Sequence, residues 1–266
     1  MKFLLYVSKS SKKLSKSISD EILSNFDENK NFNTKFQSED HYCFFQQLKK
    51  NQSPDKSLNF GNEITLSESN IYNKEKLLDT FELKKDCSDT DILNFLRKLG
   101  SESFKEVDGA FAYISFDKET KKIFLARDIF GHIPLYYFCN DNEMIVSNCL
   151  KSIIAARPAK KVSSRRVLDY ILNISSNTKH TFYDEIFRVL PSYSMRLQFN
   201  HIEKEKYFDW KDAAQIDKKD LTNSKVFSAF QNAVISRVRD KQNKIGSTLS
   251  GGIDSSAVSS VLSQYL

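Results

Sequence analysis

The sequence predicts two successive domains of different fold class. Residues 1–205 are expected to form an α+β domain with antiparallel sheet, and residues 206–266 a charged linker followed by the opening of a parallel α/β domain. Two observations predict this division. Apolar residues alternate with a period of two between residues 109 and 147, whereas a helical pattern, a short apolar run and a Gly-Gly loop follow one another after residue 221. A chain of 266 residues is long enough for two cores.

Composition and charge exclude several classes of protein. The net charge of +6 arises from 40 basic and 34 acidic residues mixed along the chain, which indicates a solvated surface and no nucleic-acid partner. The apolar run at residues 3–7 is too short for a signal peptide or a membrane span, so we expect a cytoplasmic protein without a membrane partner. The four cysteines form no C-x-x-C pair, which argues against zinc and disulfides.

The sequence before residue 88 predicts few helices or strands. Residues 8–40 are rich in Ser, Lys and Asn, and we expect loops around one weak helix at residues 20–26. A clearer helix is predicted in residues 89–99, capped by Asp89 or Thr90 and stopped by Gly100. Its apolar residues recur at helical spacing: Ile92, Phe95, Leu96 and Leu99.

The period then changes to two. A strand that ends at the polar turn "DKETK" and a returning strand at 123–126 predict a hairpin, and the runs at 134–138 and 143–147 are expected to extend it as one antiparallel meander. A helix is expected at 165–174, with short strands near 185–190 and 193–199. A second long helix is predicted at 221–238, followed by a buried strand at 245–249 and a helix that begins near residues 254–256.

The segment "SGGIDSS" (residues 250–256) has the composition of an anion-binding loop. Gly251 and Gly252 can adopt positive φ and allow the backbone to approach a phosphate, and the following helix offers its free N–H groups. Asp254 would cap that helix or meet a phosphate-bound Mg²⁺. No lysine follows the glycines, so the segment is not a loop for transfer of a terminal phosphate. The alternative is a strand-to-helix turn without a ligand. The hydroxyl donors are Ser250, Ser255 and Ser256.

Several stretches together resemble one enzyme family. "LSGGIDSSAV" resembles the pyrophosphate-binding loop of the ATP-pyrophosphatase enzymes, and of asparagine synthetase in particular. Four other stretches resemble that family in the same order along the chain, over residues 87–266. They are "SDTDILNFLRKLG", "VDGAFAYISFDKETKKIFLARDIFGHIPLYYF", "VSSRRVLDYIL…TFYDEIFRVLPSYSMRL" and "KYFDW".

The resemblance implies a fold and a two-step chemistry. The first domain would have the N-terminal-nucleophile α-β-β-α sandwich and hydrolyse glutamine to ammonia. The second would begin an α/β ATP-pyrophosphatase domain as helix, strand and helix, and use ATP and Mg²⁺ to adenylate a carboxylate, usually that of aspartate, before an amine attacks. The resemblance implies that pyrophosphate is bound by Leu249, Ser250, Gly251, Gly252, Asp254, Ser255 and Ser256.

The first domain departs from the family pattern. The family's glutaminase needs a cysteine directly after the initiator methionine, where Lys2 stands here. Cys43 cannot replace it, because its backbone nitrogen is held in an amide. The Arg-Gly-Pro segment is not found, and in place of Asn-Gly-Glu the chain has "ESN" (residues 68–70). Asp89 stands where the family binds the glutamine amino group, but we favour a helix cap as its role. We therefore expect no catalytic residue and an inactive glutaminase.

The second domain departs by its length. Leu266 lies inside the first helix after the loop, whereas the family has further strands beyond it. We expect a truncated or split member of the family, inactive alone as a synthetase. The alternatives are an accessory subunit or pseudo-enzyme that pairs with a separately encoded synthetase domain, or half of a lactam or lasso-peptide cyclase. The protein partner would be that separate synthetase domain or a second copy of the chain in a homodimer. Small-molecule partners would be ATP, a carboxylate and, in an active relative, glutamine.

Overall fold

The computed structural model describes residues 1–10, 13–26, 32–49, 59–157, 161–174, 179–213, 222–238 and 245–266. These residues form two compact units, Met1–Phe208 and Asp209–Leu266, called here the first and the second unit.

The first unit contains two antiparallel sheets of six strands each. The first sheet has the order β10-β8-β9-β1-β3-β2, and the second has the order β12-β11-β7-β6-β5-β4. The strands of the first sheet are β1 (Phe3–Ser8), β2 (Phe32–Ser38), β3 (Tyr42–Lys49), β8 (Tyr136–Cys139), β9 (Glu143–Ser147) and β10 (Phe187–Arg188). Those of the second are β4 (Asn59–Phe60), β5 (Glu63–Ile71), β6 (Gly109–Asp117), β7 (Ile123–Arg127), β11 (Tyr193–Gln198) and β12 (His201–Lys206).

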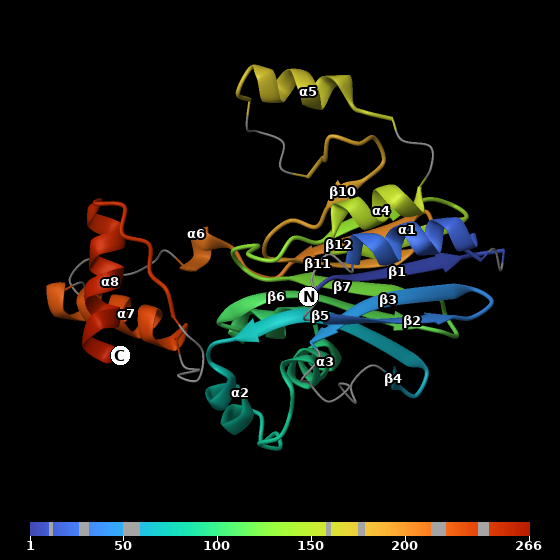
Figure 1. The fold of residues 1–266 in the computed structure, drawn as a ribbon. Helices are drawn as coiled ribbons and strands as arrows, with labels where there is room; N and C mark the ends of the chain where they lie inside the picture. Colours follow the sequence, from blue (N-terminus) through green and yellow to red (C-terminus); the bar gives the residue numbers. More distant parts are fainter. Residues whose placement is uncertain are drawn as a thin grey trace. The chain divides into compact units, whose positions relative to one another are not determined.

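Helices cover the outer face of each sheet, which makes four layers (Figure 1). The first sheet packs against α1 (Lys16–Phe26) and α4 (Leu150–Ala156). The second packs against α2 (Lys74–Thr80), α3 (Asp89–Leu99) and the 3-10 helix Ser101–Glu106. The unit is therefore an α-β-β-α sandwich, and helix α5 (Ser164–Ile171) lies apart from the two sheets.

Burial on both faces explains the sequence of the central strands. In β1, Phe3, Leu5 and Val7 point into the core between the sheets, whereas Leu4 and Tyr6 point toward α1 and α4. Successive side chains of a strand alternate between its two faces, so a strand that is buried on both sides has a continuous apolar run. The run at residues 3–7, too short for a membrane span, is thus a core strand.

Two expectations for the first unit are wrong. Residues 32–38 form the edge strand β2 where loops were expected, because pairing with β3 stabilises a mostly polar segment. The stretch 109–147 is antiparallel, as predicted, but it is not one meander. The β6–β7 hairpin belongs to the second sheet and the β8–β9 hairpin to the first, because residues 128–134 cross between the sheets. The helices predicted at 20–26 and 89–99 are present within α1 and α3, and the helix predicted at 165–174 is present as α5, which ends at Ile171.

The regular elements described in the second unit are all helices. It contains α6 (Trp210–Ala213), α7 (Asn223–Ser236) and α8 (Ile253–Tyr265). Helices α7 and α8 agree with the helices predicted on either side of the loop, whereas α6 lies where a linker was expected. The strand expected at residues 245–249 is not formed, and the side chain of Leu249 is 69% exposed. The described residues of this unit include no other strand that could pair with the segment, and an unpaired strand leaves its N–H and C=O groups unsatisfied. No described helix is long and apolar enough to cross a membrane.

Candidate functional site

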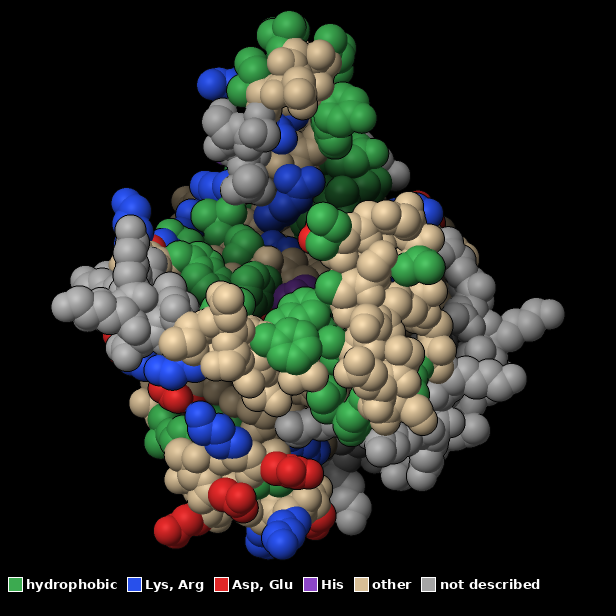
Figure 2. All heavy atoms as spheres, turned by 90° about the vertical axis from the view of Figure 1, so that its left-hand side faces the viewer, with side chains coloured by type: hydrophobic (Ala, Val, Ile, Leu, Met, Phe, Trp, Pro, Cys, Tyr) green, Lys and Arg blue, Asp and Glu red, His purple; other side chains and the backbone are tan. Residues whose placement is uncertain are grey.

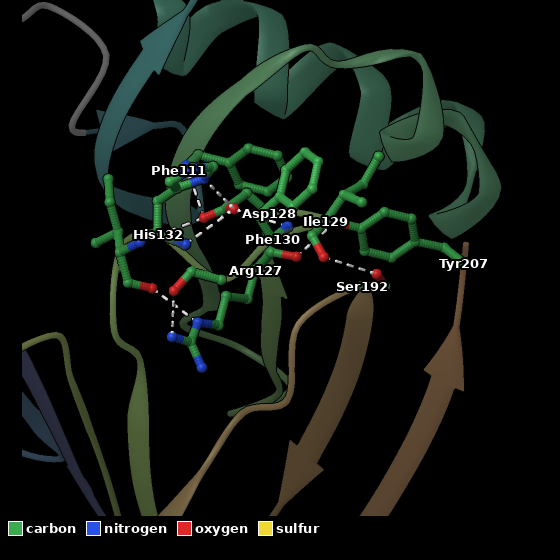
Figure 3. Close-up of polar contacts among 10 residues, drawn as sticks. Phe111, Arg127, Asp128, Ile129, Phe130, His132, Ser192 and Tyr207 are labelled. Atoms are coloured by element: carbon green, nitrogen blue, oxygen red, sulfur yellow. Dashed lines mark hydrogen bonds and ion pairs between the residues drawn. The ribbon is translucent and has the colours of Figure 1, made fainter. Parts of the chain in front are cut away.

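The crossing between the sheets is organised around the carboxylate of Asp128, which follows β7 and is fully buried (Figure 3). Its Oδ1 accepts the backbone N–H of Phe130 at 3.1 Å and of His132 at 3.0 Å, and it lies 3.0 Å from His132 Nδ1. Its Oδ2 accepts the N–H of Phe111 at 3.2 Å and of Ile133 at 3.3 Å. Buried charges are tolerated only when hydrogen bonds of this kind replace water. The carboxylate therefore has a structural role in this turn.

The neighbouring side chain of Arg127 holds the same crossing from the other side. Its guanidinium donates to three backbone carbonyls, those of Gly131 at 2.6 Å, Val189 at 2.7 Å and Ile133 at 2.8 Å. Burial lowers the pKa of Arg127. Gly131 adopts a φ of +68°, and a Cβ there would lie 2.7 Å from Pro191. The Arg-Asp-x-x-Gly pattern is thus a folding element that fixes the path between the sheets.

The chain start lies beside Glu68 of β5 and Asn148. The α-ammonium group of Met1 is 2.5 Å from Glu68 Oε1, and Asn148 Nδ2 donates to Glu68 Oε2 at 2.7 Å and to the carbonyl of Met1 at 2.6 Å. Asn148 Oδ1 also accepts the N–H of Phe3 at 2.8 Å. Glu68 stands out in the sequence as a departure from the family pattern. Nothing in the sequence marks Asn148, because only the pairing of β1 with β9 brings residue 148 to the chain start.

Lys2 points away from this group of side chains. Its Nζ donates to the carbonyl of Asn25 at 2.5 Å, near the end of α1, and its backbone N–H donates to Gln47 Oε1 at 3.1 Å. A lysine at the C-terminal end of a helix binds carbonyl groups left without an intrahelical donor. The position therefore carries an ammonium group in a structural contact.

Asp89 does not cap helix α3, and that expectation is wrong. The cap is Ser88, whose Oγ accepts the N–H of Asp91 at 3.2 Å, while Asp91 Oδ2 accepts the N–H of Ser88 at 2.8 Å. Asp89 lies in the first turn, where its Oδ2 accepts the N–H of Ile71 at 2.9 Å and its Oδ1 lies 3.3 Å from Lys74 Nζ. Both oxygens of the expected glutamine-binding carboxylate thus have partners within the protein.

The four cysteines are free, and none of them takes part in the contacts among Met1, Glu68 and Asn148. Cys43 pairs with Tyr6 across β3 and β1 and is buried, and this burial raises the pKa of its thiol to about 12. Burial, followed by the charge of Asp141, raises the pKa of the Cys139 thiol to about 11. Since the thiolate is the nucleophilic form of cysteine, neither side chain is activated at neutral pH.

The Gly-Gly loop of the second unit opens helix α8. Gly251 has the expected positive φ, at +83°, but Gly252 is the N-cap residue and has an extended backbone, with φ −82° and ψ 159°. Ser255 Oγ and Ser256 Oγ donate to the carbonyl of Gly252 at 3.1 and 2.9 Å. Ser250 Oγ lies 3.0 Å from Ser255 Oγ. The serine hydroxyls therefore form hydrogen bonds within the loop and the first turn of α8, and these bonds stabilise the turn.

Asp254 was expected either to cap helix α8 or to bind a phosphate-bound Mg²⁺ ion, and the structure contradicts only the first of these roles. Asp254 is exposed in the first turn of α8, and no side chain caps this helix, so the cap is not formed. The part of the chain that is described holds no group of three or more His, Cys, Asp or Glu side chains suited to a metal. A single exposed carboxylate fits only a Mg²⁺ ion that is carried mainly by phosphate oxygens.

Solved structures and family models agree with this architecture. A structure described as the allosteric regulatory enzyme of purine biosynthesis superposes with a TM-score of 0.51 at 12% identity, over 78% of this chain and 49% of that one. The fold is that of the class II glutamine amidotransferases, the N-terminal-nucleophile sandwich. A family described as "Glutamine amidotransferase domain" matches residues 57–208, and one described as "Asparagine synthase" matches residues 225–266.

Curated relatives identify the family more narrowly. The chain is 31% identical over 219 residues to a Methanocaldococcus jannaschii protein named "Putative asparagine synthetase (glutamine-hydrolyzing) 2", covering 79% of this chain and 42% of that protein. It is 26% identical to the asparagine synthetase of Homo sapiens, over 74% of this chain and 35% of the relative. The chain therefore belongs to the asparagine synthetase family. It spans less than half the length of these relatives.

Proposed function

We propose that this chain belongs to an ATP-dependent, asparagine synthetase-like system that forms an amide through an adenylated carboxylate. Residues 1–205 are assigned as a glutaminase-like domain that no longer hydrolyses glutamine. Residues 206–266 are assigned as a linker and the start of the ATP-binding domain. The observation that carries the proposal is the Ser-Gly-Gly loop at the start of α8, in the segment that matches the asparagine synthase family.

The loop offers donors suited to pyrophosphate. The first N–H groups of an α-helix have no intrahelical acceptor, and at α8 these belong to Ile253, Asp254 and Ser255. The helix dipole adds to their attraction for an anion. Gly251 turns the chain into the helix with its positive φ, and the exposed loop is open to a ligand. Leu249, Ser250, Gly252 and Ser256 complete the proposed pyrophosphate-binding segment.

ATP bound with Mg²⁺ would supply a pyrophosphate leaving group for activation of the carboxylate. The role of this chain would be to hold the departing pyrophosphate at the N-terminus of α8. Asp254 would contribute one carboxylate oxygen to the ion, since Mg²⁺ in nucleotide sites is held by one or two carboxylates and by phosphates.

The loss of glutaminase activity is supported by the surroundings of the chain start. A cysteine nucleophile needs a thiol with a base beside it, and Lys2 supplies an ammonium group that is directed to Asn25. Glu68 and Asn148 bind the backbone of Met1. The two carboxylate oxygens of Asp89 already contact Ile71 and Lys74. Ammonia or another amine would then have to come from a different source.

A second candidate function is a non-catalytic subunit that pairs with a separate synthetase domain. Several apolar side chains of the second unit are exposed, including Phe227 of α7 and Ile253 of α8, the latter by 87%. Exposed apolar side chains of this size mark contact surfaces when they lie together. A synthetase domain supplied by another chain would cover them.

The proposed loop can be tested by titrating Mg²⁺-pyrophosphate and Mg²⁺-ATP into the full chain. Because exposed charge–dipole contacts contribute only about 0.3–1 kcal/mol each, we expect binding no tighter than millimolar, which corresponds to a binding free energy of about −4 kcal/mol. Gly251→Val should abolish the binding-induced shifts of loop resonances, because valine is strained at this positive φ.

The control is Ser263→Ala, at the other end of α8. The Ser263 hydroxyl donates to the carbonyl of Ser260, three residues earlier, at 2.9 Å, just as the Ser255 hydroxyl donates to the carbonyl of Gly252. This variant should leave the shifts unchanged. Binding that survives Gly251→Val would contradict the assignment of the loop, and micromolar affinity would mean that another part of the chain binds ATP.

A further inference from the structure

Helix α5 of the first unit presents an apolar side to solvent. Because an α-helix has 3.6 residues per turn, Val167, Leu168 and Ile171 lie on one side of α5, and Leu172 directly follows the helix on that side. We call these four residues the α5 face. All four are exposed, Ile171 by 71%, and α5 contains no buried residue. Figure 2 shows apolar side chains gathered around α5, at the top of the view.

Two aromatic side chains extend this apolar surface. Tyr170 of α5 and Phe182 are both exposed, and their rings meet edge to face with centroids 5.5 Å apart. Exposed apolar side chains that lie together mark contact surfaces. The α5 face and this ring pair are therefore a candidate contact surface.

The opposite side of α5 is polar and faces the protein. Arg166 and Asp169 line a cavity of about 560 Å³ between the helix and the segments that follow β7 and β10, and Arg166 Nη1 donates to Asp169 Oδ2 at 2.9 Å. These two side chains are only 15% and 17% exposed. A surface helix normally buries its apolar stripe and exposes its charges. Helix α5 does the reverse, so the first unit leaves the α5 face uncovered.

The charges of α5 oppose the dipole of the helix. Its first turn holds Arg165 and Arg166 and no acidic residue, and its last turn holds no basic residue. Because a helix carries partial positive charge at its N-terminus and partial negative charge at its C-terminus, a cation is unfavourable in the first turn and favourable beside a last turn. Asp169 pairs with Arg166, whereas Arg165 is exposed. An antiparallel neighbouring helix would place its last turn beside Arg165.

We propose that the α5 face binds the α5 face of a second copy of this chain, with the two helices antiparallel. The contact is isologous: the same surface serves on both copies, related by a two-fold axis near Leu168, which is midway between Ser164 and Leu172. Each α5 face covers the other, and Arg165 of each copy lies beside the last turn of the other helix. Because a helix of about two turns offers a small contact area, the dimer is weak and reversible.

A lipid surface suits α5 less well. Residues 161–174 carry two exposed cations, Lys161 and Arg165, whereas basic clusters that bind anionic lipids contain about 4–8. A lipid surface also offers no helix C-terminus to Arg165. The arrangement of charges on α5 therefore favours a second copy of the chain.

Sedimentation velocity of the full chain between about 10 µM and 1 mM tests the association. We expect a reversible monomer–dimer equilibrium with its midpoint in this range. Leu168→Glu places a charge at the centre of the contact and should weaken dimerisation at least tenfold. The matched control is Leu99→Glu at the end of α3, since Leu99 is 55% exposed and Leu168 is 54% exposed, and it should change the affinity less than twofold. A chain that stays monomeric at about 1 mM, or equal effects of the two substitutions, would overturn the proposal.

A further control concerns the exposed apolar side chains of the second unit. Ile253→Glu changes such a side chain in α8 and should leave dimerisation unchanged. Dimerisation that is lost in Ile253→Glu and retained in Leu168→Glu would mean that the second unit holds the copies together, which would refute the α5 contact.

Charge reversal tests the antiparallel arrangement. Arg165→Glu places an anion beside the last turn of the other helix at two symmetric positions, and it should weaken dimerisation about three- to thirtyfold. Lys98→Glu makes the same change of charge at an exposed residue of α3 and should change the affinity less than twofold. If Arg165→Glu leaves dimerisation unchanged or strengthens it, the helices do not pair antiparallel.

Cross-linking tests the position of the two-fold axis. Leu168→Cys should form a disulfide-linked dimer under mild oxidation, because residue 168 of one copy meets residue 168 of the other. The wild-type chain, with its four free cysteines, and Leu99→Cys give the background, and a yield no higher than this background would contradict the arrangement.

Vesicles of phosphatidylserine and phosphatidylcholine test the other occupant, and the chain should not bind them. Vesicle binding that Leu168→Glu abolishes, with a chain that is monomeric in solution, would assign the α5 face to lipid and overturn the proposal. Far-ultraviolet circular dichroism of each variant shows whether the helices and sheets are retained.

Discussion

Asp89, in the first turn of α3, accepts the backbone N–H of Ile71 at the end of β5, with an Oδ2 to N distance of 2.9 Å. This contact ties a helix to a sheet, and Lys74 pairs with the other carboxylate oxygen. Asp89→Ala should lower the free energy of unfolding by about 1–3 kcal/mol, because a partly buried N–H loses its charged acceptor. Urea denaturation of the full chain measures the change.

Two matched variants make that measurement specific. Ser88→Ala removes the true cap and should cost about 1 kcal/mol. Asp86→Ala removes an exposed acidic residue just before the helix and should stay within about 0.5 kcal/mol. If Asp89→Ala behaves like Asp86→Ala, the contact with Ile71 contributes nothing to stability.

Replacement of Asp128 should be among the most damaging changes in the first unit. Asp128→Ala leaves four backbone N–H groups without their acceptor at the crossing between the sheets, and we expect a loss of about 3 kcal/mol or more. His132→Ala should cost about 1 kcal/mol or less, since its side chain is 44% exposed and its backbone N–H still reaches Asp128. Thermal and urea unfolding of the two variants should therefore differ clearly, and equal losses would contradict the structural role of the carboxylate.

Stability should fall in alkaline solution. Burial raises the pKa of Cys43 in the folded protein from 9.0 to about 12, so the folded state keeps a proton that the unfolded state loses. The stabilisation is complete below pH 9 and is lost as the pH rises toward 12, by at most about 1.4 kcal/mol per pH unit for this group. Cys43→Ala should reduce this slope in pH-dependent urea titrations. Some slope should remain, because burial also raises the pKa of Tyr113 to about 12 and this group contributes in the same pH range. A slope that Cys43→Ala leaves unchanged would show that Cys43 makes no measurable contribution.

The purified chain should not release glutamate from glutamine. Lys2 has no thiol, and at pH 7 the Cys43 thiol is almost entirely protonated. The wild-type chain and Cys43→Ser should therefore give the same background rate in a coupled glutamate assay. Glutamate release that copurifies with the wild-type chain and is lost in a cysteine variant would refute the proposed inactivity.

Local patterns of the sequence were enough to predict part of the first unit, but not β1, β3, β5 or α2. Alternation in residues 109–117 and 123–126 predicted β6 and β7, and helical spacing at Ile92 and Leu96 predicted α3. The Arg-Asp-x-x-Gly and Ser-Gly-Gly segments led to the family that the comparisons confirm. Such features depend on neighbours in the chain, and these are visible in the sequence itself.

Contacts between distant segments decided the rest. Only the tertiary structure showed that β2 pairs with β3 and that the β6–β7 and β8–β9 hairpins belong to different sheets. It also showed that Asp89 accepts the backbone N–H of Ile71 and does not cap helix α3. It also showed no strand at residues 245–249, although their apolar pattern predicted one. The physical reason is the same in each case: a strand or a carboxylate is stabilised by its partner, and the partner lies many residues away. The sequence by itself determined the family and the local elements, and the fold determined which of those elements found partners.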